Sequence, residues 1–253
     1  MKKIITLLLV IITSCSPQVK EEQRDLVVKT LEDFFIRCEQ DIERASKVIL
    51  DHDIIKNLTH LKMMNAGGRK YYLLERESIS DMINAVTEGV YADYILINKE
   101  GDIIYTRTND DIFGKNVRTS LAKTPLKACY ENRDIPVFFQ DVTPLSDANG
   151  EYYIFVSTKV KGGNTFPGIF ILQFDVEKLR EVLDKKTDII GADGLFRLSG
   201  KPITPYTPYE YFSNINAPNP KNGDRGVFSR PGGTTSYRFF SHDTINWILI
   251  REN

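Results

Sequence analysis

The sequence predicts an α+β protein in which a long N-terminal helix packs on an antiparallel sheet, with a second, smaller antiparallel sheet after it. Three observations support this fold class. Residues 22–58 contain neither proline nor glycine and repeat apolar residues at helical spacing. From residue 94 onward the apolar runs are short and are separated by glycine-containing turns, which is typical of antiparallel strands. A second series of such runs begins near residue 187.

The first predicted element is the helix over residues 22–58, which at 1.5 Å per residue reaches about 50 Å. Its apolar positions are Leu31, Phe34, Phe35, Cys38, Ile42, Ala45, Val48, Ile49 and Ile55. This length suits a stalk on which later modules pack. Residues 65–68 include two glycines and end the helical region, and a second helix is expected over 71–87.

The next elements form the first sheet. Strands over 94–98 and 102–106 flank the turn Lys99-Glu100-Gly101, which is a hairpin signal. A loop over 110–114 and a short helix over 126–131 follow. Three more strands are expected over 137–142, 152–161 and 168–174, with a helix over 176–183.

The second unit repeats the opening of the first. Strands over 188–191 and 195–198 flank Ala192-Asp193-Gly194. The stretch from 202 to 233 is rich in proline, glycine and asparagine, so we expect a long loop with short strands. Strands over 237–240 and 247–251 close this sheet.

The N-terminus has the features of a secretory signal peptide. Lys2 and Lys3 precede a short apolar run over 4–12, which is too short to span a bilayer. Residues 12–15, Ile-Thr-Ser-Cys, resemble a bacterial lipobox, which implies cleavage before Cys15 and a diacylglycerol on its sulfur. We therefore expect a lipoprotein signal peptide over 1–14 and a lipidated cysteine with a polar tether over 15–21. The alternative is an ordinary secreted protein with an incidental Cys15.

Composition excludes several classes of function. The chain has 33 basic and 34 acidic residues and no basic block, so no nucleic-acid partner is expected. Phosphate-binding loops, dinucleotide fingerprints and nucleophile elbows do not occur in the sequence, and the three histidines have no metal-ligand spacing. No enzyme activity, cofactor or metal is therefore expected, and Asp110-Asp111 is interpreted as a hydrophilic loop. Cys38 and Cys129 could pair in an oxidising compartment, but Cys38 lies on the apolar helix face, which favours two buried thiols.

The order of elements resembles the extracytoplasmic Cache sensor domains of bacterial chemoreceptors and histidine kinases, in their double-module, PAS-like form. The residues that carry the resemblance are the hairpin over 95–105, the Gly-Lys turn over 113–116, the helix start at 126–128, the strand segments over 140–142, 149–152, 157–160 and 167–172, Leu179, Tyr237 and the closing strand over 247–250. The resemblance implies a helical stalk over 22–90, a membrane-distal module over 91–185 and a smaller membrane-proximal module over 186–253.

The resemblance also implies a ligand pocket between the first sheet and its short helix. Positions matching the family's polar ligand contacts are Lys123, Asp141, Ser157 and Gln173, and the walls would be Tyr105, Arg107, Phe139, Tyr153 and Phe155. Lys123 offers a point charge where amino-acid receptors carry an arginine. Gln173 stands where they carry an acid for the ammonium. The implied ligand is a small polar metabolite, such as a carboxylate, without a demanding ammonium group.

The resulting expectation is a lipid-anchored sensor outside the cytoplasm, in the cell envelope of a bacterium. Because the sequence ends at Asn253, just after the closing strand, it would act through a partner such as a sensor kinase or chemoreceptor. A substrate-binding lipoprotein of a transporter and a structural or adhesive envelope lipoprotein are the alternatives. The long helix would either pair with a second copy, giving a homodimer, or stay packed on its own domain.

Overall fold

The computed structural model describes residues 17–63, 67–145, 150–162, 165–181, 183, 185–215 and 219–252. The predicted signal peptide and Cys15 lie outside the described residues. Three helices come first: α1 (Pro17–Asp51), α2 (Ile54–Met63) and α3 (Gly67–Asn84). Helix α1 begins at Pro17, earlier than the predicted start at residue 22, and the tether over 15–21 stays a prediction.

The first sheet has five antiparallel strands in the order β2-β1-β5-β4-β3. Its elements are β1 (Asp93–Asn98), β2 (Ile103–Thr106), α4 (Pro125–Glu131), β3 (Phe138–Pro144), β4 (Tyr152–Gly162), β5 (Thr165–Asp175) and α5 (Glu177–Arg180). The hairpin turn between β1 and β2 needs a positive φ, which Gly101 supplies at 89°.

The second sheet also has five antiparallel strands and repeats the same arrangement, in the order β7-β6-β10-β9-β8. Its elements are β6 (Thr187–Gly191), β7 (Phe196–Ser199), the 3-10 turn η1 (Phe212–Asn214), β8 (Arg225–Arg230), β9 (Gly233–His242) and β10 (Ile245–Glu252). The predicted α+β class with one helix and two antiparallel sheets is confirmed.

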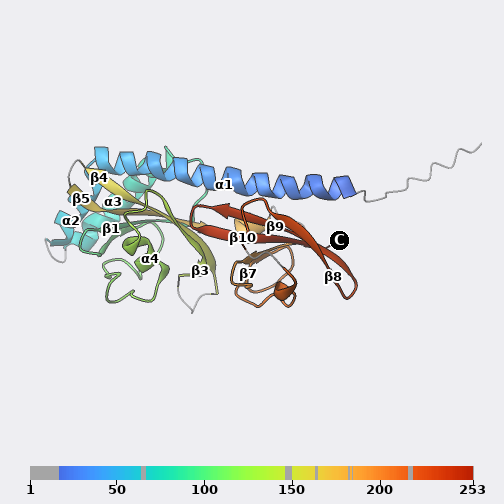
Figure 1. The fold of residues 1–253 in the computed structure, drawn as a ribbon. Coiled ribbons are helices and arrows are strands. Elements are labelled where there is room, and N and C mark those ends of the chain that lie inside the picture. Colours follow the sequence, from blue (N-terminus) through green and yellow to red (C-terminus); the bar gives the residue numbers. More distant parts are fainter. Residues whose placement is uncertain are drawn as a thin grey trace, which may run out of the picture.

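Helix α1 lies along both sheets, with its N-terminal half over the second sheet and its C-terminal half over the first (Figure 1). Its buried stripe recurs every three or four residues, so one face stays on the sheets from Val28 to Ile49. The stripe comprises Val28, Leu31, Phe35, Cys38, Ile42, Ala45 and Ile49. The predicted single helix over 22–58 is interrupted at His52–Asp53, where Asp53 adopts a φ of 51°.

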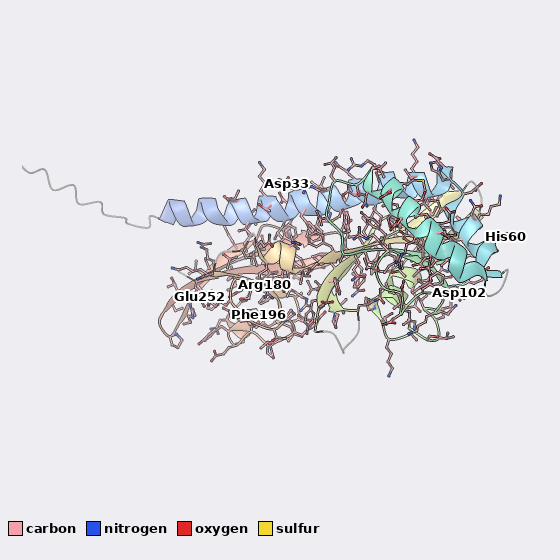
Figure 2. The ribbon with its side chains drawn as sticks, turned by 180° about the vertical axis from the view of Figure 1, so that it is seen from behind. Asp33, His60, Asp102, Arg180, Phe196 and Glu252 are labelled. Carbon is pink, nitrogen blue, oxygen red and sulfur yellow. The ribbon has the colours of Figure 1, made fainter. Side chains whose placement is uncertain are left out.

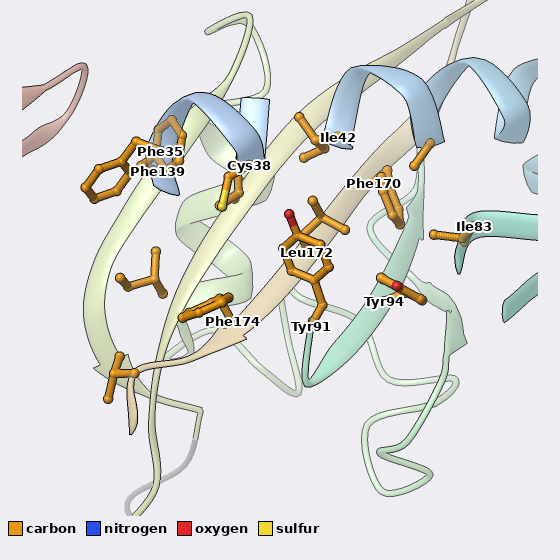
Figure 3. Packing of buried hydrophobic residues seen from close by; sticks show 14 of the residues in the cluster. Phe35, Cys38, Ile42, Ile83, Tyr91, Tyr94, Phe139, Phe170, Leu172 and Phe174 are labelled. Carbon is orange, nitrogen blue, oxygen red and sulfur yellow. The ribbon is translucent and has the colours of Figure 1, made fainter. Parts of the chain in front are cut away.

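The first sheet buries two different faces. One face, here called the helix face, packs on α1 to α3 and carries Tyr94, Phe139, Phe170 and Leu172. Figure 3 shows Phe35, Cys38 and Ile42 of α1 above these strands. The other face, here called the α4 face, carries Ile95, Phe155 and Ile171 against Leu126 and Cys129. The two described cysteines are free and buried, on opposite faces of the sheet, which confirms two buried thiols.

Phe35 lies where the two sheets meet under α1. Its ring contacts Phe139 of the first sheet at 5.2 Å and Phe240 and Trp247 of the second at 5.7 and 5.5 Å between centroids. Figure 2 shows Phe196 and Glu252 toward the second-sheet end of the molecule and His60 and Asp102 at the opposite end. Among the described helices, none is long and apolar enough to cross a membrane.

Candidate functional site

A cavity of about 490 Å³ opens at one end of the first sheet. Because neighbouring strands are antiparallel, this end collects the residues before β1, after β2 and β3, at the start of β4 and at the end of β5. The lining residues are Ala92, Thr108, Asn109, Asp110, Asp111, Leu145, Glu151, Tyr153 and Gln173. Its size lies within the range of small-molecule sites.

The most buried polar side chain in the cavity is Gln173, which is 4% exposed. Alternation along β5 continues the α4 face from Ile171 to Gln173, so the amide points to that side of the sheet. Among the described residues, its Oε1 atom has no hydrogen-bond partner. An unpaired buried carbonyl oxygen is costly, and a donor from a ligand would relieve that cost.

One wall of the cavity is formed by the start of β4. The Tyr153 hydroxyl donates a hydrogen bond to Oε2 of Glu151 at 2.5 Å. Burial and the adjacent Glu151 carboxylate raise the pKa of Tyr153, so it remains a neutral donor at physiological pH. Glu151 is therefore held with its charge at the cavity.

The opposite wall follows β2 and is fixed by the buried Asp93. Its Oδ1 accepts from the backbone N–H groups of Arg107 at 2.6 Å and Thr108 at 3.2 Å. Its Oδ2 accepts from the Thr106 hydroxyl at 2.6 Å. Burial raises the pKa of Asp93, although these hydrogen bonds oppose the shift. The carboxyl group thus positions the chain that leads into Thr108–Asp111.

Arg107 lies behind this wall and does not line the cavity. Its guanidinium donates to the carbonyl oxygens of Tyr91 and Ala92, the latter at 3.0 Å. It also lies over the Tyr94 ring, 4.4 Å from the centroid. These contacts fix residues 91–92 at the start of β1, so the side chain acts as a brace.

The cavity is acidic. Asp110 is paired with Arg76 at 2.6 Å. Asp111 and Glu151 have no cationic partner among the described residues, and no lysine or arginine lines the cavity. Uncompensated carboxylates beside a buried amide oxygen form a site that attracts hydrogen-bond donors of positive charge.

The structure brings some of the sequence-predicted site residues together. Tyr153 and Gln173 line the cavity, and Arg107 braces its wall. Phe155 and Ser157 are on the same face but are buried beside α4, where Phe155 contacts the Tyr153 ring at 6.1 Å. Their ligand contacts stay predictions.

Four other predicted site residues lie elsewhere. Tyr105 and Phe139 are on the helix face, where the Tyr105 hydroxyl lies 2.7 Å from Oγ of Ser80. Lys123 is exposed before α4 and does not line the cavity. Asp141 is at the junction of the two sheets, where it accepts hydrogen bonds from Arg197 Nε at 2.6 Å and Trp247 Nε1 at 2.8 Å.

Asp141 lies two residues after Phe139, whose side chain is on the helix face, in a part of β3 that is irregular. The register between β3 and β4 shifts between Gln140 and Thr143. Such a bulge turns the intervening side chains away from the regular alternation. The family resemblance matched Asp141 to a ligand contact by its position in the strand, without establishing which face of β3 its side chain is on.

Sequence reasoning missed the acidic lining. The sequence alone predicts a hydrophilic loop at Asp110-Asp111 and includes Glu151 only in the segment 149–152 that carries the family resemblance, whereas in the structure all three line the cavity. The sequence did contain the acidic residues, and in an antiparallel sheet the end of β2, the start of β4 and the end of β5 meet at the same end of the sheet. Their joint charge becomes visible only when the strand order is known.

One group of metal-capable side chains comes together among the described residues. Nε2 of His242 lies 2.8 Å from Oε1 of Glu39, with Asp243 beside them. The sequence did not associate these residues, which come from α1 and the β9–β10 turn. The His242 ring also stacks on the Phe35 ring, with 4.9 Å between the ring centroids. The contacts of His242 with Glu39 and Phe35 therefore join α1 to the second sheet.

Comparison with known proteins supports the fold. No family profile matches the chain, and no curated protein matches it. The ligand-binding domain of the Pseudomonas fluorescens chemoreceptor CtaA, solved with L-serine, is 13% identical with a TM-score of 0.58, covering 92% of this chain and 94% of that one. The sensory domain of the Campylobacter jejuni chemoreceptor Tlp3, solved with isoleucine, is 10% identical with a TM-score of 0.59, covering 92% and 90%.

A third similar structure is an extracellular ligand binding receptor from Desulfohalobium retbaense. It is 8% identical with a TM-score of 0.63, and the match covers 91% of this chain but 39% of that one. At these identities the similarity establishes the fold. The chain has the fold of chemoreceptor ligand-binding domains, which confirms the predicted resemblance to Cache sensor domains.

Proposed function

We propose that this protein is an extracytoplasmic sensor that binds a small polar metabolite in the cavity of its first sheet. The observation that carries the proposal is the cavity itself, with the unpaired buried oxygen of Gln173, in a fold shared with chemoreceptor ligand-binding domains. A pocket with one buried polar group and few placed charges is the usual form of a small-molecule site. Binding would proceed without a chemical step.

The second sheet supports a different role for its own module. The face that corresponds to the α4 face of the first sheet is filled by aromatic and aliphatic side chains around Ile190, Phe196, Ile248 and Ile250. Asp141 and Phe35 join this module to the first. The second module is therefore proposed to relay a ligand-dependent change to a partner rather than to bind the ligand.

The lipid anchor and the partner are part of the proposal. The lipobox-like Cys15 would hold the chain on the outer side of a bacterial membrane. A sensor kinase or chemoreceptor would then carry the signal by recognising the ligand-bound population. Purification of the protein from its native membrane, with and without ligand, tests for such a partner.

The decisive experiment is thermal unfolding of the purified protein against a library of organic acids, amino acids, amines and nucleosides. Ligand at a hundredfold excess over its dissociation constant adds about 2.7 kcal/mol to the free energy of unfolding. A reproducible increase in Tm that Gln173→Leu reduces is the expected result. A protein that unfolds cooperatively and responds to no compound would instead favour the structural envelope lipoprotein.

A further inference from the structure

We propose that the cavity is specific for small primary amines that carry no carboxylate. This inference rests on the proposed function, because it names the ligand class of the same cavity. It differs from the carboxylate ligand that the sequence implied. It rests on the charge of the lining, on the unpaired oxygen of Gln173 and on where the nearby cations are already bound.

The buried amide determines the kind of ligand atom. Oε1 of Gln173 can only accept a hydrogen bond, this buried oxygen has no partner among the described residues, and Gln173 is one of the residues that line the cavity. A protonated amine brings N–H donors, whereas a carboxylate brings only acceptors. A quaternary ammonium has the charge but no N–H group, so it would leave this oxygen unpaired.

The cavity mouth determines the sign of the ligand's charge. Asp111 and Glu151 are exposed acids without a cationic partner among the described residues. Tyr153 donates to Glu151 at 2.5 Å and holds that carboxylate at the cavity. An ammonium group seated on Gln173 gains from both charges, because attraction is less screened inside a partly enclosed site than in bulk water.

None of the nearby cations lines the cavity, so none is placed to pair with a ligand carboxylate there. Arg76 is paired with Asp110 at 2.6 Å. Arg107 is bound to the backbone of Tyr91 and Ala92 and lies over an aromatic ring. Lys123 is exposed and does not line the cavity. A zwitterionic amino acid would therefore bring a carboxylate into an acidic site without compensation.

The test compares ligands that each contain four carbon atoms. Butylamine, butyrate, L-2-aminobutyrate and tetramethylammonium are titrated into the purified protein by calorimetry at one ionic strength, and thermal unfolding is recorded in parallel. We expect butylamine to bind and to raise Tm. The other three should bind at least about tenfold more weakly, the cost of one missing or repelled charged hydrogen bond.

Variants locate the binding to this cavity. Glu151→Gln and Asp111→Asn remove one charge each at exposed positions and should weaken butylamine several-fold without loss of folding. Gln173→Leu should weaken butylamine about tenfold and remove its advantage over tetramethylammonium. Glu210→Gln removes an equally exposed charge in the second module and should leave the affinity unchanged.

The outcomes separate the two proposals. If butyrate or L-2-aminobutyrate binds as tightly as butylamine, the amine specificity is wrong while the sensor function stands. If the four probes fail and the library yields only ligands without a primary amine, the amine specificity is also wrong. If no compound of any class binds to a cooperatively folded protein, both proposals fall.

Discussion

Asp141 shows how one side chain can serve the whole molecule rather than a ligand. Its two oxygens accept hydrogen bonds from Arg197 and Trp247, which belong to the second sheet. The Arg197 side chain is only 7% exposed and has Asp193 as a second partner at 2.8 Å. Loss of Asp141 would leave the Trp247 N–H without an acceptor.

We expect Asp141→Ala to reduce the free energy of unfolding by about 2–3 kcal/mol, because it breaks a partly buried ion pair and leaves a buried donor unpaired. Chemical denaturation measures the loss. Asp134→Ala is the control, because its pair with Lys159 is exposed and should cost less than about 1 kcal/mol. If the Asp141→Ala protein keeps its stability but loses ligand binding, Asp141 contacts the ligand and the structural role is wrong.

Asp41 is the second buried carboxylate with a structural role. It lies in α1 and accepts hydrogen bonds from the N–H groups of Glu88 and Gly89, from the Tyr91 hydroxyl and from Arg44. Burial alone would raise the pKa of Asp41, but these four donors outweigh burial and hold it below its usual value. The charged form is therefore stabilised in the folded state.

A lowered pKa predicts a pH dependence of known sign. The stabilisation from Asp41 is present above the ordinary aspartate pKa of about 4 and is lost as the pH falls through the lower folded value. Asp41→Asn should cost about 2–3 kcal/mol at pH 7, and the difference from the unmodified protein should shrink below about pH 4. Urea denaturation at pH 7 and pH 3 measures it.

The comparison with the unmodified protein isolates Asp41 from other acids. Burial raises the pKa of Asp93 and Asp188, so they contribute with the opposite sign, but they are common to both proteins. Asp33 is an exposed acid on the same helix, so Asp33→Asn should leave the free energy of unfolding unchanged at both pH 7 and pH 3. A difference that stays constant between pH 7 and pH 3 would contradict the assignment.

At the scale of elements, α1 is the part that sequence periodicity predicted best. The stripe from Leu31 to Ile49 is buried as expected, because spacing by three and four residues is visible without any knowledge of the fold. The break at Asp53 was missed. An aspartate can adopt a positive φ at modest cost, so no glycine or proline marks the end of the helix.

The contrast between two neighbours on α1 gives a prediction for this element. Phe35 is fully buried and contacts both sheets, whereas Ile36 is 44% exposed. We expect Phe35→Ala to cost about 3–5 kcal/mol through the cavity it leaves, and Ile36→Ala to cost about 0.5 kcal/mol or less. Denaturant titration of both variants measures the two losses in the free energy of unfolding. Losses of similar size would mean that α1 does not bridge the sheets in solution.

For the whole molecule, sequence reasoning predicted the two sheets and their hairpins but only part of the candidate site. Strand runs and glycine turns are local signals, and they recovered every strand of the first sheet to within a few residues. The cavity, by contrast, is lined by residues that are far apart in the sequence. Gln173 and Tyr153 were found through the family resemblance, whereas Asp111 and Glu151 join them only through the strand order.

The position of α1 also bears on how the molecule would sit at a membrane. Cys15 precedes Pro17, the first residue of α1, by two positions. The N-terminal half of α1 lies over the second sheet (Figure 1), so an acyl chain on Cys15 would place that sheet near the membrane and the proposed ligand cavity in the module farther from it. This arrangement agrees with the proposed order, in which the module over 186–253 is membrane-proximal and the module over 91–185 is membrane-distal.

The anchor itself is tested by changing one sulfur atom. Cys15→Ala should abolish incorporation of labelled palmitate and move the protein from the membrane to the soluble fraction, because each buried methylene contributes about 0.8 kcal/mol to membrane binding. Cys38→Ala is the matched control, since Cys38 is 1% exposed on the buried stripe of α1 and should retain both label and membrane. Burial also raises the pKa of its thiol to about 12, which disfavours the reactive thiolate form. If Cys15→Ala stays labelled and membrane-bound, the anchor lies elsewhere, and the proposed order of the modules loses its basis.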